Sequence, residues 1–120
     1  SIVWKLMGMD LTKISLPVIL AEPQCILQRA CDNNNYCEEL VARAAHEPNS
    51  LRRLAWTAAH NISQFNIVKY RSSKPFNPHL GETYELVTED FRFIAEQVSH
   101  HPPISAYYQE GKDYKLSGRL

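Results

Sequence analysis

Apolar and polar residues alternate through the last third of the sequence, a pattern typical of β-strands with one buried face. The alternating segments span residues 83–87, 91–95, 104–108 and 114–117. Turn-forming residues separate them at 89–90 and 110–113. The pattern predicts an antiparallel meander. The sequence stops at Leu120 in what looks like a further strand, so we expect an open sheet edge and an unfinished domain.

Between residues 49 and 65, apolar residues recur with the period of a helix and not with that of a strand. One stripe of this segment is apolar and consists of Leu51, Leu54, Ala55, Ala58, Ile62 and Phe65. Asn49 or Ser50 can cap the first turn, because either side chain can accept hydrogen bonds from free backbone N–H groups. We expect the apolar stripe to pack against a neighbouring element.

Two shorter helices are predicted upstream. Pro23 can occupy the first position of one helix, since its missing N–H is not needed there. The polar run at 32–35 interrupts the pattern. Asn35 and Glu38 then have the spacing of a capping box for a second helix. The whole segment 23–66 is therefore predicted to consist of helices.

Proline-containing segments border the helices on both sides. Residues 1–22 form an apolar arm with few charges, which Pro17 prevents from becoming one helix. Residues 67–82 form a proline-rich loop, whose prolines argue against both a helix and a central strand. With strands in 83–120, helices precede strands without alternating with them. The predicted fold class is α+β.

Composition limits the class of protein. The 120 residues suffice for one domain, and 44% hydrophobic with 22% charged residues describes a globular segment. The longest strictly apolar stretch, around 18–21, is too short for a bilayer, which needs about 20 apolar residues. No secretion signal opens the sequence, so we expect a cytoplasmic location. Cys25, Cys31 and Cys37 recur every six residues and cannot share one helix face, which favours buried thiols over a disulfide or metal site.

The charges are segregated along the chain, although 13 basic and 13 acidic residues give a formal net charge of zero. Residues 48–81 contain five Lys and Arg but no Asp or Glu, whereas residues 82–96 contain five acidic residues and one Arg. One interpretation is a positive surface for a phosphate, a membrane or another anionic partner. The other is an ordinary solvated helix end and loop.

The densest group of unusual residues is 96–103, where His100 and His101 precede two prolines. Neighbouring strand side chains diverge, so both imidazoles could serve one ligand only where the strand ends, and the prolines provide that end. Protonated imidazoles donate two hydrogen bonds each and can bind a phosphate. Lys74 and Asn77 on the proline-rich loop could add a charge and an amide donor, although the sequence alone does not bring the two loops together.

Other interpretations of the histidine pair remain open. Adjacent histidines are poorly spaced for joint metal chelation, and no other histidine has a recognised spacing with them. Ser99 as a nucleophile lacks the G-x-S-x-G elbow. The pair could also simply close a strand. The neighbouring aromatic residues fit core and cross-strand pairs better than a nucleic-acid surface.

Three ordered motifs resemble the family of oxysterol-binding proteins and their related proteins. Glu-Gln-Val-Ser-His-His-Pro-Pro at 96–103 matches the family signature at all eight positions. Lys-Pro-Phe-Asn-Pro at 74–78, followed by Leu-Gly-Glu-Thr-Tyr-Glu at 80–85, is similar to the second hallmark. The arm at 10–18 and the Glu-Pro at 22–23 resemble the lid region. His79 departs from the family, whose members commonly carry an apolar residue there.

The resemblance implies the N-terminal part of a lipid-exchange domain, a large antiparallel barrel around a hydrophobic tunnel. A sterol or other lipid would compete in the tunnel with phosphatidylinositol 4-phosphate, whose headgroup would meet Lys74, Asn77, His100 and His101. The lid would cover lipid with Leu11, Ile14, Leu16 and Ile19.

We therefore expect lipid transfer between membranes, with no enzyme activity, cofactor, metal or nucleic-acid partner. A phosphoinositide sensor that transfers no lipid is the alternative. Contact with anionic membranes would be peripheral, and the isolated chain would self-associate.

Overall fold

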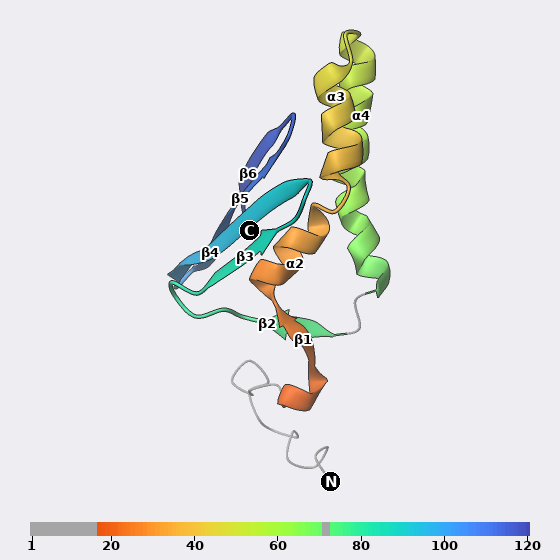
Figure 1. Cartoon of the computed structure of the whole chain (residues 1–120). Helices are drawn as coiled ribbons and strands as arrows, with labels where there is room; N and C mark the ends of the chain where they lie inside the picture. The colour runs from red at the N-terminus through yellow and green to blue at the C-terminus, as the bar shows by residue number, and fades with distance from the viewer. Residues whose placement is uncertain (1–16, 71–72) are drawn as a thin grey trace.

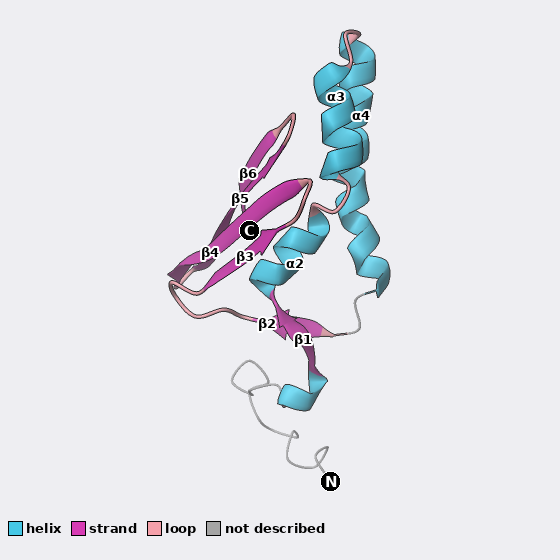
Figure 2. Cartoon of the chain, viewed as in Figure 1, coloured by secondary structure: helices cyan, strands magenta, loops and turns pink. Residues whose placement is uncertain are grey.

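The computed structural model describes residues 17–70 and 73–120 (Figures 1 and 2). A turn of 3₁₀ helix, η2, opens this part, and helices mostly precede strands. The elements are η2 (Val18–Leu20), β1 (Ala21–Cys25), α2 (Ile26–Asn33), the π-helical η3 (Cys37–Val41), α3 (Ala42–His46), α4 (Ser50–Ser63), the 3₁₀-helical η4 (Gln64–Tyr70), β2 (Lys74–Phe76), β3 (Thr83–Val87), β4 (Phe91–His100), β5 (Pro103–Gly111) and β6 (Lys115–Arg119).

The last four strands form one antiparallel sheet in the order β3-β4-β5-β6, which confirms the predicted meander. β3 has the predicted bounds, whereas β4 and β5 are longer than predicted because they pair with each other along almost their whole length. The turn between β3 and β4 is closed by Thr88, whose N–H donates to the Phe91 carbonyl at 2.9 Å. The sheet is open, with β3 and β6 at its edges. The α+β fold class with an incomplete barrel sheet is confirmed.

Helix α2 packs on the sheet and forms the core with it. Its buried residues Leu27, Ala30 and Cys31 follow the i, i+3, i+4 spacing of one helix face. They meet Phe93 and Ala95, which alternate on the buried face of β4. The Phe93 ring lies with its centroid 6.0 Å from that of Tyr107 on β5, so aromatic contacts join the strands beneath the helix.

The start of the helical segment differs from the prediction. Pro23 lies in strand β1, which pairs in parallel with β2, and the helix begins only at Ile26. Proline is tolerated in β1 because, in the part of the chain that the structure describes, this strand has a partner on one side only. The proline-rich segment likewise contains a short strand, β2, where the sequence predicted only loop.

The capping predictions have one success and one failure. Asn49 caps α4, since its Oδ1 accepts from the N–H groups of Leu51 at 3.0 Å and Arg52 at 3.1 Å. The capping box of Asn35 with Glu38 does not form, because Tyr36 precedes η3 and provides no side-chain cap. Glu38 instead accepts the hydroxyl hydrogen of Tyr114 at 2.6 Å.

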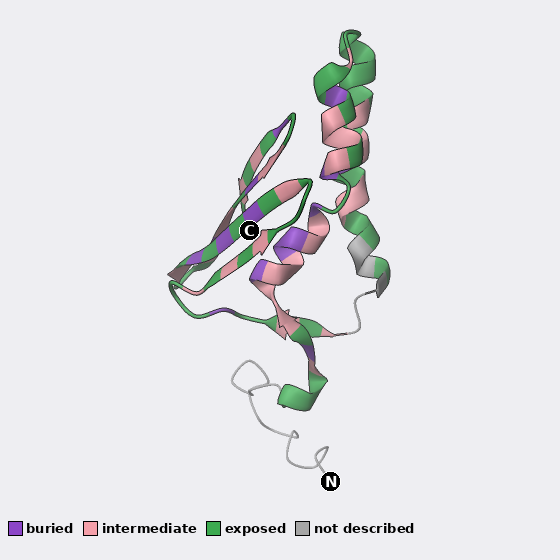
Figure 3. Ribbon diagram, viewed as in Figure 1, coloured by how far each residue is buried: buried purple, intermediate pink, exposed green. Residues whose placement is uncertain are grey.

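The predicted apolar stripe, which runs along α4 and ends at Phe65 in η4, is not covered by any element within residues 17–70 and 73–120, contrary to expectation. α4 packs against η3 and α3, and these helices project beyond the sheet (Figure 1). Exposed residues dominate the outer part of α3 and α4 (Figure 3). Leu51 is 76% exposed and Phe65 is 73% exposed. The stripe is therefore available to further protein or to lipid.

Candidate functional site

The loop that carries Asn77 is fixed against the sheet by backbone hydrogen bonds. Gly81 has a φ of +78°, a conformation that favours glycine, and its N–H donates to the Gln97 carbonyl at 2.9 Å. The Gln97 N–H in turn donates to the Glu82 carbonyl at 3.0 Å. Pro78 is fully buried, so the residue that follows Asn77 is anchored as well. The proline-rich loop and β4 thus meet, which the sequence alone could not establish.

Lys74 lies at the other end of this loop and is held there by β1. It begins β2 and lies in register with Ala21 of β1. The Ser73 N–H donates to the buried Glu22 carboxylate at 3.3 Å, and Glu22 also forms an ion pair with Arg29 of α2. This pairing ties β1, α2 and the residue before Lys74 into one unit.

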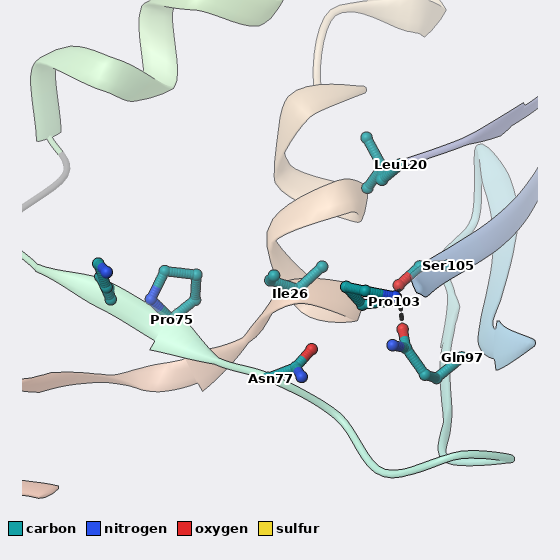
Figure 4. A pocket seen from close by; sticks show the side chains of 8 residues that line it. Ile26, Pro75, Asn77, Gln97, Pro103, Ser105 and Leu120 are labelled. Atoms are coloured by element: carbon teal, nitrogen blue, oxygen red, sulfur yellow. Dashed lines mark hydrogen bonds between the residues drawn. The ribbon is translucent and has the colours of Figure 1, made fainter. Parts of the chain in front are cut away.

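A pocket of about 430 Å³ lies where these elements converge (Figure 4). Two of the predicted ligands, Lys74 and Asn77, line it. Its other lining residues are Ile26, Pro75, Gln97, Pro103, Ser105 and Leu120. One cation and several amide or hydroxyl groups thus share a cavity with apolar walls, which suits a ligand that carries a negative charge on a partly apolar body.

The histidine pair closes β4 beside this pocket. His100 lies opposite Pro103, one of the pocket residues, although neither His100 nor His101 lines the pocket itself. The two imidazole centroids are 4.8 Å apart in an edge-to-face arrangement. His100 Nδ1 is buried and has no hydrogen-bond partner within residues 17–70 and 73–120, while His101 is exposed. The strand end therefore brings both rings together, as predicted.

Ser99 forms a hydrogen bond within the turn that follows β4. Its Oγ donates to the Pro102 carbonyl at 2.7 Å, so its proton is not directed at a neighbouring imidazole. No group of three or more potential metal ligands gathers among the residues that the structure describes.

The predicted lid contacts can be compared with the structure at one position only. Leu11, Ile14 and Leu16 lie outside the described residues. Ile19 belongs to η2 and is 86% exposed, with Val18 and Leu20 exposed beside it. Ile19 thus presents an apolar side chain without covering the described core.

The sequence interpretation missed the polar residues of the buried sheet face. Gln97 and Gln109 are each 1% exposed and Ser105 is 4% exposed. Ser105 Oγ donates to Gln97 Oε1, and Gln109 Nε2 donates to the Tyr114 hydroxyl at 2.8 Å. The signal that could have found them is their position. Gln97 continues the buried alternation of Phe93 and Ala95 on β4, and Ser105 and Gln109 lie opposite Gln97 and Phe93 on β5.

The buried thiols lie away from the pocket and are poor nucleophiles. Burial raises the pKa of Cys31 to about 11, and burial together with the nearby Glu38 carboxylate raises the pKa of Cys37 to about 12. The Cys37 sulfur lies 3.8 Å from His60 Nε2, and burial lowers the pKa of His60. All three cysteines are free thiols.

Sequence comparison identifies the family of this chain. The family model described as "Oxysterol-binding protein" matches residues 1–120, and the chain belongs to this family. It is 50% identical over 110 residues to the human oxysterol-binding protein-related protein 3, a match that covers 89% of this chain and 12% of that protein. It is 45% identical over 126 residues to the mouse oxysterol-binding protein-related protein 2, covering 100% and 25%. The chain thus spans a quarter or less of the length of these relatives.

Solved structures share the fold. The Osh1 ORD domain in complex with ergosterol superposes with a TM-score of 0.82 at 39% identity, over 96% of this chain and 28% of that one. The Osh3 ORD of Saccharomyces cerevisiae in complex with PI(4)P gives a TM-score of 0.80 at 36% identity, over 98% and 32%. Among the helices that the structure describes, none is long and apolar enough to cross a membrane.

Proposed function

We propose that this chain forms part of a lipid-binding domain that exchanges a sterol or another lipid for phosphatidylinositol 4-phosphate between membranes. The observation that carries the proposal is the shared pocket of Lys74 and Asn77, beside the strand end that holds His100 and His101. It is supported by related domains that were solved with ergosterol and with PI(4)P. The chemistry is non-covalent, so the protein acts as a carrier and not as an enzyme.

A phosphomonoester fits these groups by charge and by hydrogen bonding. Lys74 offers an ammonium group, Asn77 an amide donor, and the imidazoles of His100 and His101 offer further N–H groups. The Nδ1 of His100 is buried and has no hydrogen-bond partner among the described residues, which favours a ligand that reaches this strand end. A sterol lacks a charge and gains little from the cations, so the same groups discriminate between the two lipids.

The arm at 1–22 would act as the lid and the membrane contact. Leu11, Ile14, Leu16 and Ile19 would cover bound lipid when the lid is closed and would meet the membrane when it is open. The 86% exposure of Ile19 supports an apolar surface at this end of the arm. Contact with anionic membranes would be peripheral, assisted by the basic segment 48–81.

The direct test replaces both histidines by alanine in the intact domain. Charge-assisted hydrogen bonds contribute about 1.5–3 kcal/mol each, so His100→Ala with His101→Ala should weaken phosphoinositide binding about a hundredfold or more. Sterol binding should change little. His46→Ala is the matched control, because His46 lies on α3 and pairs with Asp113 at 3.1 Å. Intact phosphoinositide affinity in the double variant would refute the site.

Transfer is separated from sensing by following both lipids between donor and acceptor liposomes. A carrier moves sterol and phosphoinositide in opposite directions, whereas a sensor binds the headgroup and moves neither. Mass spectrometry of the recovered lipids checks the non-enzymatic part of the proposal, since hydrolysis would leave chemically changed lipid.

The isolated 120-residue chain should also self-associate. Two features of the described residues support this proposal: the exposed apolar stripe of α4 and the positions of β3 and β6 at the edges of the sheet. Pairing of a sheet edge with a second copy would satisfy its backbone groups, and contact between α4 stripes would bury their apolar side chains.

A further inference from the structure

The Gln97 side chain combines burial with an unused hydrogen-bond donor at the pocket. Gln97 is 1% exposed and lines the pocket with Lys74 and Asn77. Its Nε2 has no hydrogen-bond partner in the described part of the chain. Leaving a buried amide N–H unpaired is costly, so this group indicates a ligand that supplies an oxygen acceptor.

Ser105 contacts one end of the Gln97 amide in the structure. The Ser105 hydroxyl donates to Gln97 Oε1, so the oxygen is satisfied and the nitrogen is directed elsewhere. Figure 4 shows the amide oxygen against Ser105 and the nitrogen turned toward the side of the pocket that carries Asn77. Ser105 is thus a positioning residue, and Gln97 presents the free donor.

Gln109 provides an internal comparison. It lies on the same sheet face and is equally buried, but its Nε2 donates to the Tyr114 hydroxyl at 2.8 Å. Gln109 does not line the pocket with Lys74. Of these two buried glutamines, only Gln97 couples a free N–H group to the candidate ligand cavity.

We propose that Gln97 Nε2 donates a hydrogen bond to an uncharged ring hydroxyl of the phosphorylated inositol headgroup. This inference rests on the proposed function, because it takes the phosphate to be bound by Lys74 and the histidine pair. A phosphate would be drawn to the cations, whereas a neutral amide matches a neutral hydroxyl. Since Gln97 and Lys74 line one pocket, a single ligand that satisfies both must carry a hydroxyl as well as a charged group. A phosphorylated polyol meets this requirement, and a sterol does not.

The experiment combines a protein substitution with a ligand deletion in the intact domain. The ligands are short-chain phosphatidylinositol 4-phosphate and its ring-deoxy analogues, each lacking one hydroxyl, and affinity is measured by titration calorimetry. Gln97→Met, which removes the donor at similar volume, should weaken binding of the parent lipid about tenfold, equivalent to about 1.4 kcal/mol. One deoxy analogue should bind wild type about tenfold more weakly and lose nothing further with Gln97→Met.

Matched variants keep the result interpretable. Gln109→Met removes an equally buried amide away from the pocket and should leave affinity unchanged. The series on wild-type protein does not depend on how any variant folds, and affinity undiminished by every single-hydroxyl deletion would overturn the inference. The inference would also be overturned if the loss from Gln97→Met added to the loss from every hydroxyl deletion. An equal loss of affinity for sterol and for phosphoinositide in Gln97→Met would overturn it too. If Lys74→Ala leaves affinity intact, the proposed function fails; if it weakens binding while Gln97→Met does not, only this inference fails.

Discussion

Replacing Glu22 by glutamine tests how the structure holds the candidate pocket together. The Glu22 carboxylate is 4% exposed, pairs with Arg29 and accepts the Ser73 N–H at 3.3 Å. Breaking a buried ion pair from one side costs about 3–5 kcal/mol, because the remaining charge is left without its partner. In the variant, the charge of Arg29 would still be partly stabilised, because Asp32 lies 3.9 Å from its guanidinium and the Arg29 side chain is 19% exposed to solvent. We therefore expect Glu22→Gln to lower the free energy of unfolding by about 3 kcal/mol, at the low end of that range.

Urea unfolding followed by circular dichroism measures this loss. With a slope of about 1–3 kcal/mol per molar urea, the midpoint should fall by about 1 M or more. Glu39→Gln is the control, because Glu39 pairs with Arg43 at 3.5 Å while both side chains are more than half exposed. Exposed pairs contribute about 0–1 kcal/mol, so this variant should remain close to wild type. If the two variants unfold at the same urea concentration, Glu22 does not secure β1 and α2 to the residue before Lys74.

Four shorter predictions follow from other features. Iodoacetamide at pH 8 should modify Cys25 much faster than Cys31 or Cys37, whose raised pKa values of about 11 and about 12 keep them protonated, and mass spectrometry measures the extent of modification. The same pKa shifts contribute stability below pH 9 that should be lost as the pH rises toward 12, which alkaline unfolding measures. Asn49→Ala should cost about 1 kcal/mol in thermal unfolding, because two N–H groups of α4 lose their acceptor. Deleting residues 1–20 should speed loss of bound lipid in a fluorescence off-rate assay, and unchanged rates would contradict a lid. Light scattering should find the isolated chain associated, and a cooperatively unfolding monomer without exposed apolar surface would contradict that expectation.

Local patterns predicted the elements whose partners are close in sequence. Alternation located β3 to β6 because each of these strands pairs with the next one along the chain. Asn49 could be predicted as a cap because its acceptor oxygen serves N–H groups two and three residues away. Predictions failed where distant residues intervened. Pro23 is drawn into β1 by pairing with β2, and Glu38 is taken from its expected cap by Tyr114, 76 residues away.

The candidate site divides in the same way. The residue types of Lys74, Asn77 and the histidine pair indicated phosphate chemistry from sequence, and their roles stay predictions. That their loops approach one another depends on the bonds between Gly81, Glu82 and the Gln97 backbone, which no local period encodes. The buried positions of Gln97 and Ser105 could not be predicted for a related reason, because a polar residue in a strand is expected to face outward unless its face of the sheet is known to be buried.

The uncovered stripe of α4 shows why binding should be measured in the intact domain. Leu51, Leu54, Ile62 and Phe65 are 64–76% exposed. Burying one such side chain contributes about 1.5–3 kcal/mol, so covering four could contribute several kcal/mol even after their present partial burial is discounted. That is a large part of the roughly 5–15 kcal/mol that stabilises a domain. We expect either a second copy or additional chain to provide this cover, since the match with the Osh1 ORD domain covers only 28% of that domain's chain. We expect such a cover to fix α4 more firmly against α3 and η3, and η3 carries Glu38, which accepts a hydrogen bond from the Tyr114 hydroxyl at the sheet.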